Sequence, residues 1–210
     1  MSAPDARVFN PRANDTRIAK EQVRALVALE SQLPTQTNRT QEQVEFQQFS
    51  TPPHYAYAIA WLANIDENDV VLEPSAGTGN LVAPARNAAP KALYANELSQ
   101  RRADLLQSVG IADEVTRENA TYLNAVLPAH IQPTVIVMNP PFSATAGRTS
   151  QNDLMEGAKH VEQALARLAP GGRLVAIVGG GRESDGGMSL TAPTFREWWN
   201  TVAFMYNVRL

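Results

Sequence analysis

Apolar residues along this chain recur with two spacings, which alternate from one end of the sequence to the other. Apolar positions three and four apart are typical of amphipathic helices, whereas short apolar runs bounded by turn residues are typical of buried strands. Helices are predicted over 16–31, 41–48, 52–62, 98–109, 152–168 and 194–201, and strands over 69–73, 91–96, 111–116, 134–138, 173–178 and from 203 onward. Strands that alternate with helices indicate an α/β fold in which helices cover a mostly parallel sheet.

The segment 134–142 reads Thr-Val-Ile-Val-Met-Asn-Pro-Pro-Phe and is the part of the sequence most informative about function. Its first half is apolar at every position, which predicts a strand buried on both faces. Two prolines cannot continue a strand ladder, so the strand ends there and Asn139 stands at its carboxyl end. Ligands bind at this edge of open α/β sheets, and Asn139 is therefore a candidate functional residue.

Asn139, Pro140, Pro141 and Phe142 are suited to one kind of chemistry. An amino group on a planar ring is a poor nucleophile, because its lone pair is delocalised into the ring. The Asn139 side-chain carbonyl and a proline main-chain carbonyl can each accept one N–H hydrogen, which favours a pyramidal nitrogen with an available lone pair. Phe142 offers a flat face for an extruded base. The alternative is a strand followed by a proline-rich turn without catalytic function.

A second candidate segment follows the first predicted strand, where Glu73 precedes Pro-Ser-Ala-Gly-Thr-Gly-Asn over 74–80. Gly77 and Gly79 would let the backbone approach a ligand, and the N-terminus of the next helix would supply free N–H groups. The spacing differs from Gly-x-Gly-x-x-Gly, so a dinucleotide site is less favoured. The alternative is a tight connection between a strand and a helix.

Several segments, taken in order, are similar to those of one enzyme superfamily: Thr-Pro-Pro at 51–53, Glu-Pro-Ser-Ala-Gly-Thr-Gly at 73–79, Glu97, Asn-Pro-Pro-Phe at 139–142 and Pro-Gly-Gly at 170–172. The chain resembles class I S-adenosylmethionine-dependent amino-methyltransferases. The likeness is to DNA N6-adenine methyltransferases and to the methyltransferase-like domain of large phage and plasmid helicase-linked proteins.

The resemblance implies a Rossmann-like, three-layer α/β/α domain with a mostly parallel sheet over 46–210, preceded by a helical extension over 1–45. Such a sheet normally finishes with a strand hairpin, of which only the first strand is visible in this sequence. We therefore expect a sheet truncated at that hairpin, in a chain that is part of a longer or split enzyme.

The resemblance also implies S-adenosylmethionine as the cofactor. Thr51, with Phe49 beside it, would contact the methionine portion, and Glu73 would lie near the cofactor's amino group. Glu97 would accept both ribose hydroxyls, with a simple helix N-terminal carboxylate as the alternative. Asn119 stands where the family usually has Asp for the adenine amino group, with Glu118 as the competing residue. The expected cofactor contacts are Phe49, Thr51, Glu73, Pro74, Ser75, Ala76, Gly77, Gly79, Asn80, Glu97, Asn119 and Asn139.

Local patterns predict where some side chains lie. Thr51 is a suitable N-cap with Pro52 at the first helical position. Leu98, Leu105 and Leu106 are expected on the inner face of the helix over 98–109.

Several aromatic and apolar side chains and one histidine could have either a functional or a structural role. Tyr122 and Leu123 would either flank the cofactor's adenine or belong to the core. His160 has no second histidine or carboxylate at metal-site spacing, so a surface or interfacial position is expected and no metal site. Trp198 and Trp199 are expected to be core anchors rather than base-stacking platforms.

Composition limits the classes of protein that fit. The chain has 210 residues, 44% of them hydrophobic and 19% charged, which is ordinary for a globular domain. It lacks cysteine, a signal peptide and an apolar run of membrane-spanning length, so a cytoplasmic location without membrane attachment is expected. The net charge is −3 and the pI is about 5.6, and the sequence shows no obvious basic face for nucleic acid. Target recognition would therefore come from a partner domain or subunit.

These observations predict transfer of a methyl group to an exocyclic amino group of a nucleobase, foremost adenine N6 in DNA, in a restriction-modification, phage or plasmid setting. Methylation of RNA, at adenine N6 or guanine N2, is the second interpretation. Methylation of a glutamine amide is weaker, because those enzymes usually carry a different glycine loop. The alternative from another class is a non-catalytic module that binds cofactor or nucleic acid in a helicase or anti-restriction assembly.

Overall fold

The fold is described from a computed structural model for residues 9–12, 15–32, 50–141, 156–177 and 197–201. The helices are α1 (Thr16–Glu30), α3 (Pro53–Leu62), α4 (Val82–Asn87), α5 (Gln100–Val109), the 3-10 helix η2 (Ala120–Tyr122), α6 (Leu123–Val126) and α7 (Glu156–Arg167). The strands are β1 (Val70–Glu73), β2 (Ala92–Asn96), β3 (Glu114–Thr116), β4 (Val135–Met138) and β5 (Arg173–Ala176). The helix predicted over 41–48, the strand predicted from 203, Phe49 and Phe142 lie outside the described residues.

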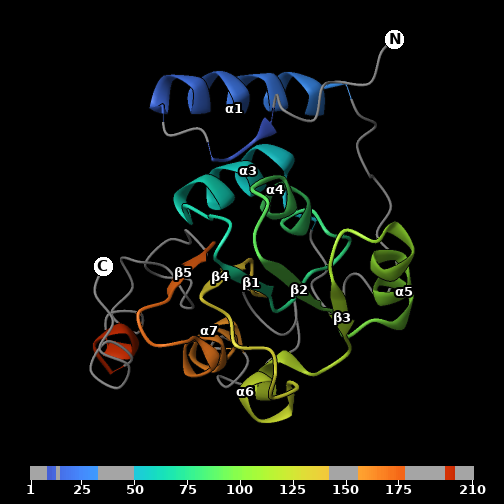
Figure 1. Cartoon of the computed structure of the whole chain (residues 1–210), viewed down its shortest axis with the longest axis vertical. Helices are drawn as coiled ribbons and strands as arrows, with labels where there is room; N and C mark the ends of the chain where they lie inside the picture. Colours follow the sequence, from blue (N-terminus) through green and yellow to red (C-terminus); the bar gives the residue numbers. More distant parts are fainter. Residues whose placement is uncertain (1–8, 13–14, 33–49, 142–155, 178–196, 202–210) are drawn as a thin grey trace.

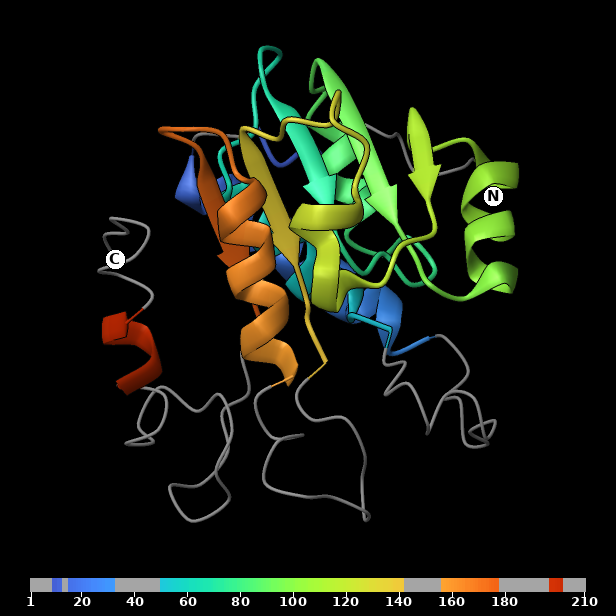
Figure 2. The same cartoon turned by 90° about the horizontal axis from the view of Figure 1, so that it is seen from below.

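The strands form one parallel sheet in the order β3-β2-β1-β4-β5. β1 lies at its centre, where Val71 is opposite Leu93 of β2 and Val135 of β4. Figures 1 and 2 show α3 and α4 on one face of the sheet, α6 and α7 on the other, and α5 near β3. The expected three-layer α/β/α Rossmann-like architecture with a parallel sheet is confirmed.

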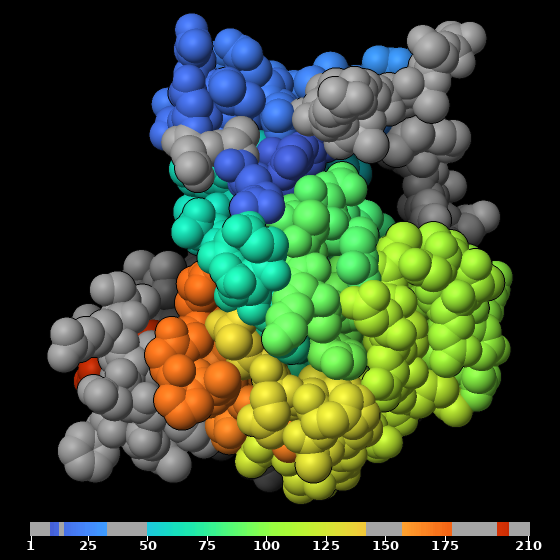
Figure 3. All heavy atoms as spheres, viewed as in Figure 1, coloured from blue at the N-terminus to red at the C-terminus, as the bar shows by residue number. Residues whose placement is uncertain are grey.

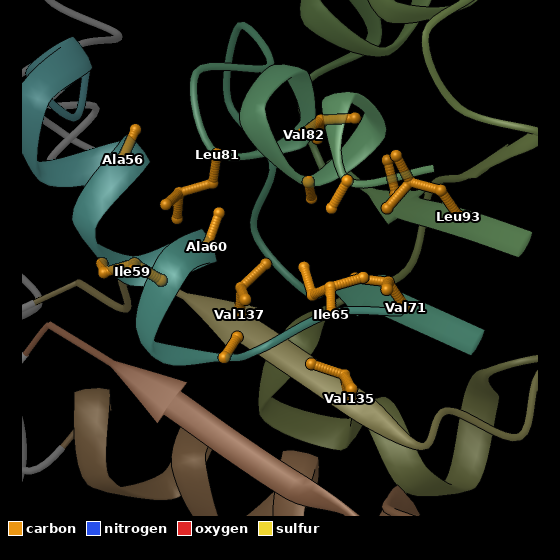
Figure 4. Packing of buried hydrophobic residues seen from close by; sticks show 14 of the residues in the cluster. Ala56, Ile59, Ala60, Ile65, Val71, Leu81, Val82, Leu93, Val135 and Val137 are labelled. Carbon is orange, nitrogen blue, oxygen red and sulfur yellow. The ribbon is translucent and has the colours of Figure 1, made fainter. Parts of the chain in front are cut away.

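Side chains on β4 alternate between the two faces of the sheet and join two separate cores. Val135 and Val137 pack with side chains from α3 and α4, as Figure 4 shows, whereas Ile136 and Met138 pack with α6 and α7. All four are fully buried, and burying each such side chain stabilises the fold by roughly 1.5–3 kcal/mol. The buried strand predicted at 134–138 is confirmed, so Asn139 follows a rigid element.

Helix α1 forms an outer layer over α3, and the space-filling view shows it at one end of the molecule (Figure 3). Asp15 begins the helix by accepting the Arg17 backbone N–H at 2.7 Å. Ala19 and Leu26 are buried with Tyr57 of α3 in a small third core. The helix predicted over 16–31 is confirmed. No helix within the described ranges is both long and apolar enough to cross a membrane.

Helix α5 turns a different face inward from the one its leucines predict. Leu106 is buried, but Leu98 and Leu105 are 46% and 45% exposed, and Ala103 takes the inward position instead. Adjacent residues on a helix point about 100° apart, and here Leu106 points inward while Leu105 points toward solvent. Leu98 precedes Gln100, where α5 begins. The inward placement of Leu98 and Leu105 was therefore wrong.

The other face of the sheet is covered by α7 and the segments that pack on it. His160 of α7 is only 9% exposed, with Nε2 3.3 Å from Thr121 Oγ1. Of the two expected positions, surface or interfacial, the surface position is therefore wrong. The reason is that η2 and α6 pack against a second side of α7. Trp198 and Trp199 pack on the same core, which confirms their expected role as anchors. Strand β5 is half-buried along its length, where a buried strand was expected.

Two glycines with positive φ provide a matched test of packing. Gly79 has φ +94° and Gly110 has φ +67°. A Cβ at Gly79 would lie 2.9 Å from Leu106 Cδ2 and from Ile111 Cδ1, whereas a Cβ at Gly110 would meet nothing within 4 Å. We expect Gly110→Ala to lower the free energy of unfolding by about 1 kcal/mol through backbone conformation alone. Gly79→Ala should cost about 1–3 kcal/mol more because of overpacking. Urea unfolding measures both, and equal losses would contradict this packing.

Candidate functional site

A pocket opens between the ends of β1 and β4, at the carboxyl edge of the sheet. It is lined by residues from the start of α3, the end of β1, the turn after β1 and the turn after β4. The lining residues that the sequence predicted are Thr51, Glu73, Ser75, Ala76, Gly77, Asn80 and Asn139. The glycine-rich turn after β1 and Asn139 after β4, which are far apart in the sequence, therefore line the same pocket.

The glycine-rich turn after β1 is held by the end of β2. Ala76 N–H donates to the Asn96 carbonyl at 2.8 Å, and Gly77 N–H donates to Glu97 Oε2 at 2.8 Å. Gly77 has φ +57°, a conformation that residues with a Cβ rarely adopt. The turn is therefore fixed by contacts to its neighbour strand, and its backbone forms one wall of the pocket.

Glu73 is a buried carboxylate at the end of β1, with 1% of its surface exposed. Oε2 accepts the Ser75 N–H at 2.9 Å, whereas Oε1 has no hydrogen-bond partner among the described residues. Burial raises the pKa of Glu73 well above its ordinary value of 4.5, and the negative charge of Glu97 raises it further. The backbone amides of Ser75 and Asn139 act in the opposite direction. A cation bound in the pocket would stabilise the ionised form of the Glu73 carboxylate.

Asn139 presents an acceptor to the same pocket. Its Nδ2 donates to Thr51 Oγ1 at 3.0 Å, and its buried Oδ1 has no hydrogen-bond partner among the described residues. Pro140 is buried and Pro141 is half-buried, so the turn is held rigidly after β4. A buried carbonyl oxygen without a donor costs about 1–3 kcal/mol, which marks it as a position that an N–H from a ligand can satisfy.

Thr51 connects these two parts of the pocket, and it does so in a way that the sequence did not predict. Helix α3 begins at Pro53, with Pro52 as its cap residue and no side-chain cap bond, so the expectation that Thr51 is the N-cap was wrong. The reason is that the Thr51 hydroxyl faces Asn139 instead. The Thr51 carbonyl accepts Asn80 Nδ2 at 2.7 Å, which ties it to the glycine-rich turn.

Several predicted cofactor residues lie beside the pocket rather than in its lining. Both oxygens of Glu97 accept backbone N–H groups, Oε2 from Gly77 and Oε1 from Ser99 at 2.8 Å. Asn119 is exposed and begins η2 by accepting the Thr121 N–H at 3.0 Å. The remaining predicted residues outside the lining are Pro74, Gly79, Pro140 and Pro141. The ribose and adenine roles stay predictions.

Tyr122 and Leu123, each expected either in the core or beside the adenine, differ in burial. Leu123 is fully buried and belongs to the core under α7, whereas Tyr122 is 60% exposed. Leu123 is thus a core residue, and Tyr122 is not.

Some residues at the site escaped the sequence analysis. The lining also includes Ser50, Thr78, Leu81 and Arg102. Arg102 Nη1 lies 3.8 Å from Glu97 Oε2, and its position on α5, one turn beyond a strand-end acid, is the signal that could have pointed to it. Within the described residues, no group of three or more His, Asp or Glu side chains could hold a metal ion.

Asn96 is a further residue that the sequence analysis missed, and its side chain connects two loops next to the pocket. Its Nδ2 donates to the carbonyls of Pro74 and Glu118, both at 2.9 Å. Its Oδ1 accepts the Glu118 N–H and the Thr116 hydroxyl, both at 2.8 Å. Asn96 therefore locks the glycine-rich turn to the loop after β3. Its place just before Glu97 was the available signal.

The comparisons with known proteins agree with this fold. No protein-family model matches the sequence. The chain is 27% identical over 148 residues to the type II restriction enzyme and methyltransferase RM.BcgI of Heyndrickxia coagulans, covering 61% of this chain. This chain thus spans 23% of that protein's length.

Solved structures provide the comparison of folds. The candidate RNA methyltransferase PH1948 from Pyrococcus horikoshii matches with a TM-score of 0.60 at 20% identity, covering 89% of this chain and 82% of that one. A SAM-dependent O-methyltransferase from Thermotoga maritima matches with a TM-score of 0.50 at 14% identity, covering 80% and 52%. The chain has the fold of class I methyltransferases.

Burial of Glu73 makes stability depend on pH in a defined direction. Because its folded-state pKa lies above the ordinary 4.5, the folded protein keeps a proton that the unfolded chain has already lost. Stability contributed by this group therefore falls as pH rises from 4.5 through the folded-state pKa. Glu73→Gln keeps the shape without the charge, so we expect it to raise the Tm of the ligand-free protein near about pH 7.

Calorimetric melting across pH measures this effect. The control is Glu21→Gln, which changes an exposed carboxyl on α1 and should shift stability by less than about 0.5 kcal/mol. A Glu73→Gln protein with the same Tm and the same pH dependence as wild type would contradict the raised pKa.

Proposed function

We propose that this chain binds S-adenosylmethionine in the pocket between β1 and β4 and transfers its methyl group to an exocyclic amino group of a nucleobase, with adenine N6 in DNA as the foremost target. The observation that carries the proposal is the buried, unpartnered Oδ1 of Asn139, which shares a pocket with Glu73 and Gly77. An acceptor for an amino hydrogen thus belongs to the residues that line this pocket.

The chemistry of the lining residues fits the cofactor. The cofactor carries an ammonium and a sulfonium, and the free Oε1 of Glu73 is an acceptor suited to the ammonium. Gly77 lets the backbone of the turn approach a ligand closely. When bound, the cofactor would supply an electrophilic methyl group. Thr51, Glu73 and the turn over 75–80 would hold it, with Glu97 behind the turn.

The residues after β4 would act on the acceptor amine by positioning it. Asn139 Oδ1 and a proline main-chain carbonyl would each accept one of the two N–H hydrogens, which favours a pyramidal nitrogen with its lone pair directed at the methyl group. Phe142, which lies outside the described residues, would stack on the base. Such catalysis relies on orientation and hydrogen bonding, without a covalent intermediate on the protein.

The choice of nucleic acid rests on two kinds of support. The relative in Heyndrickxia coagulans is named as a restriction enzyme and methyltransferase, which favours DNA. The acidic net charge of −3 favours a partner domain or subunit that supplies target recognition. RNA, at adenine N6 or guanine N2, is the second candidate, since a protein of the same fold is named as a candidate RNA methyltransferase.

Removal of the acceptor side chain tests this proposal. We expect Asn139→Ala to lower the methyl-transfer rate by about 10²–10³-fold, the usual effect of losing one positioned hydrogen bond in a transition state. Binding of S-adenosylmethionine, measured by isothermal titration, should change little. Transfer is measured as tritiated methyl incorporation into DNA and, in parallel, into RNA of mixed sequence.

A matched control is Asn68→Ala, which removes an exposed asparagine far from the pocket and should transfer at the wild-type rate. Unimpaired transfer by Asn139→Ala would remove Asn139 from the mechanism. Methyl incorporation into RNA but not into DNA would show that RNA, and not DNA, is the target. Tight cofactor binding by wild type, with no transfer to either nucleic acid in the presence of a recognition partner, would favour the non-catalytic module.

A further inference from the structure

The Asn139 side chain can act as an acceptor only in one of its two orientations. With Nδ2 on Thr51 Oγ1, as the structure has it, Oδ1 is left to accept an N–H. Rotation of the amide by 180° would place NH₂ where Oδ1 now lies, and two N–H groups would then face each other. The orientation of this amide therefore decides whether an amine can be held.

The contact with Thr51 does not fix that orientation by itself. A hydroxyl has one donor and two acceptor lone pairs. It can accept from Asn139 Nδ2, or it can donate to Oδ1 if the amide is turned over. The reversed orientation is prevented only when the hydroxyl proton is already given to another acceptor.

The hydroxyl proton of Thr51 is available for such a role. Thr51 is 6% exposed, so solvent has little access to it. Its two hydrogen bonds among the described residues use the carbonyl, which accepts Asn80 Nδ2, and Oγ1, which accepts Asn139 Nδ2. Neither uses the hydroxyl proton, and Thr51 lines the pocket beside Glu73.

We propose that Thr51 is a positioning residue that transmits cofactor binding to Asn139: the Thr51 hydroxyl would donate a hydrogen bond to a carboxylate of the bound cofactor. Its Oγ1 could then only accept from Asn139 Nδ2, which leaves Asn139 Oδ1 for the target amine. This inference rests on the proposed function, because it takes the ligand of the pocket to be S-adenosylmethionine. A carboxylate suits the role because it accepts and cannot donate. The Asn80 contact holds Thr51 in place for both bonds.

The consequence is an order of events at the site. Without cofactor the Thr51 hydroxyl allows both orientations of the Asn139 amide, so the target amine can meet a donor instead of an acceptor. With a carboxylate present, only the productive orientation remains. The same carboxylate is present in S-adenosylhomocysteine, but 5′-methylthioadenosine lacks the whole amino-acid portion. Both ligands would fill the nucleoside region of the pocket, but only S-adenosylhomocysteine would offer a carboxylate to Thr51. Comparing them therefore isolates the effect of the carboxylate.

The variants Thr51→Val and Thr51→Ser test this relay, since valine keeps the shape without the hydroxyl and serine keeps the hydroxyl. The side-chain NH₂ signal of Asn139 is followed by NMR in protein labelled with ¹⁵N-asparagine and assigned with Asn139→Ala. S-Adenosylhomocysteine should slow its exchange with solvent in wild type and in Thr51→Ser. It should not do so in Thr51→Val, and 5′-methylthioadenosine should not do so in any of the three proteins.

Kinetics give an independent readout. At saturating S-adenosylmethionine, Thr51→Val should lower kcat by about 10- to 100-fold, the effect of losing a hydrogen bond to a charged group. Thr51→Ser should restore kcat to within about threefold of wild type. Thr16→Val, on the exposed surface of α1, serves as the control for loss of a threonine hydroxyl and should transfer at the wild-type rate.

The outcomes separate this inference from the proposed function. Equal protection of the Asn139 NH₂ in Thr51→Val and wild type would overturn the relay, as would an unchanged kcat in Thr51→Val. Protection induced equally by 5′-methylthioadenosine would overturn the role of the carboxylate. Failure of wild type to bind S-adenosylhomocysteine at all would overturn the proposed function as well.

Discussion

Parallel pairing of β1 with β4 is the constraint on which the candidate site depends. Because the two strands run in the same direction at the centre of the sheet, Glu73 and Asn139 emerge at the same edge. Buried side chains on both faces fix the strands, since β4 supplies alternate residues to two separate cores. A one-residue slip of β4 would move each of its side chains from one core to the other and shift Asn139 relative to Glu73. The geometry of the pocket is thus a consequence of how the sheet is packed.

The side-chain amides of Asn96 and Asn139 differ in how many hydrogen-bond partners the protein gives them. Asn96 has donors and acceptors on both ends and serves as a structural tie between loops. Among the residues that the structure describes, the Asn139 side chain has a partner only at Nδ2. The protein can therefore satisfy a buried amide fully, and at Asn139 it leaves one end open. Glu73 shows the same pattern: one oxygen accepts the Ser75 N–H, and the other is buried without a hydrogen-bond partner among the described residues. Open polar atoms in one place lower stability and are expected where a ligand binds.

Features that depend on neighbours in sequence were predictable. The apolar run before Asn139 and the glycines after Glu73 gave strand ends and a turn, because periodicity and proline geometry act locally. Features that depend on packing between distant segments were not. Thr51 was taken for a helix cap, although its hydroxyl faces Asn139 across 88 positions of sequence. The network around Asn96 was missed for the same reason, since the strand end alone does not show which loops lie around it.

A crystal structure of the protein with S-adenosylhomocysteine tests the central claim most directly, because it locates the ligand relative to both walls of the pocket. The account predicts ligand density between the glycine-rich turn and Asn139, with the ligand's ammonium against Glu73 and with Asn139 Oδ1 beside the sulfur and without a donor from the protein. Ligand density on another part of the protein, or an Asn139 Oδ1 closed off by the protein's own donors in the complex, would contradict it.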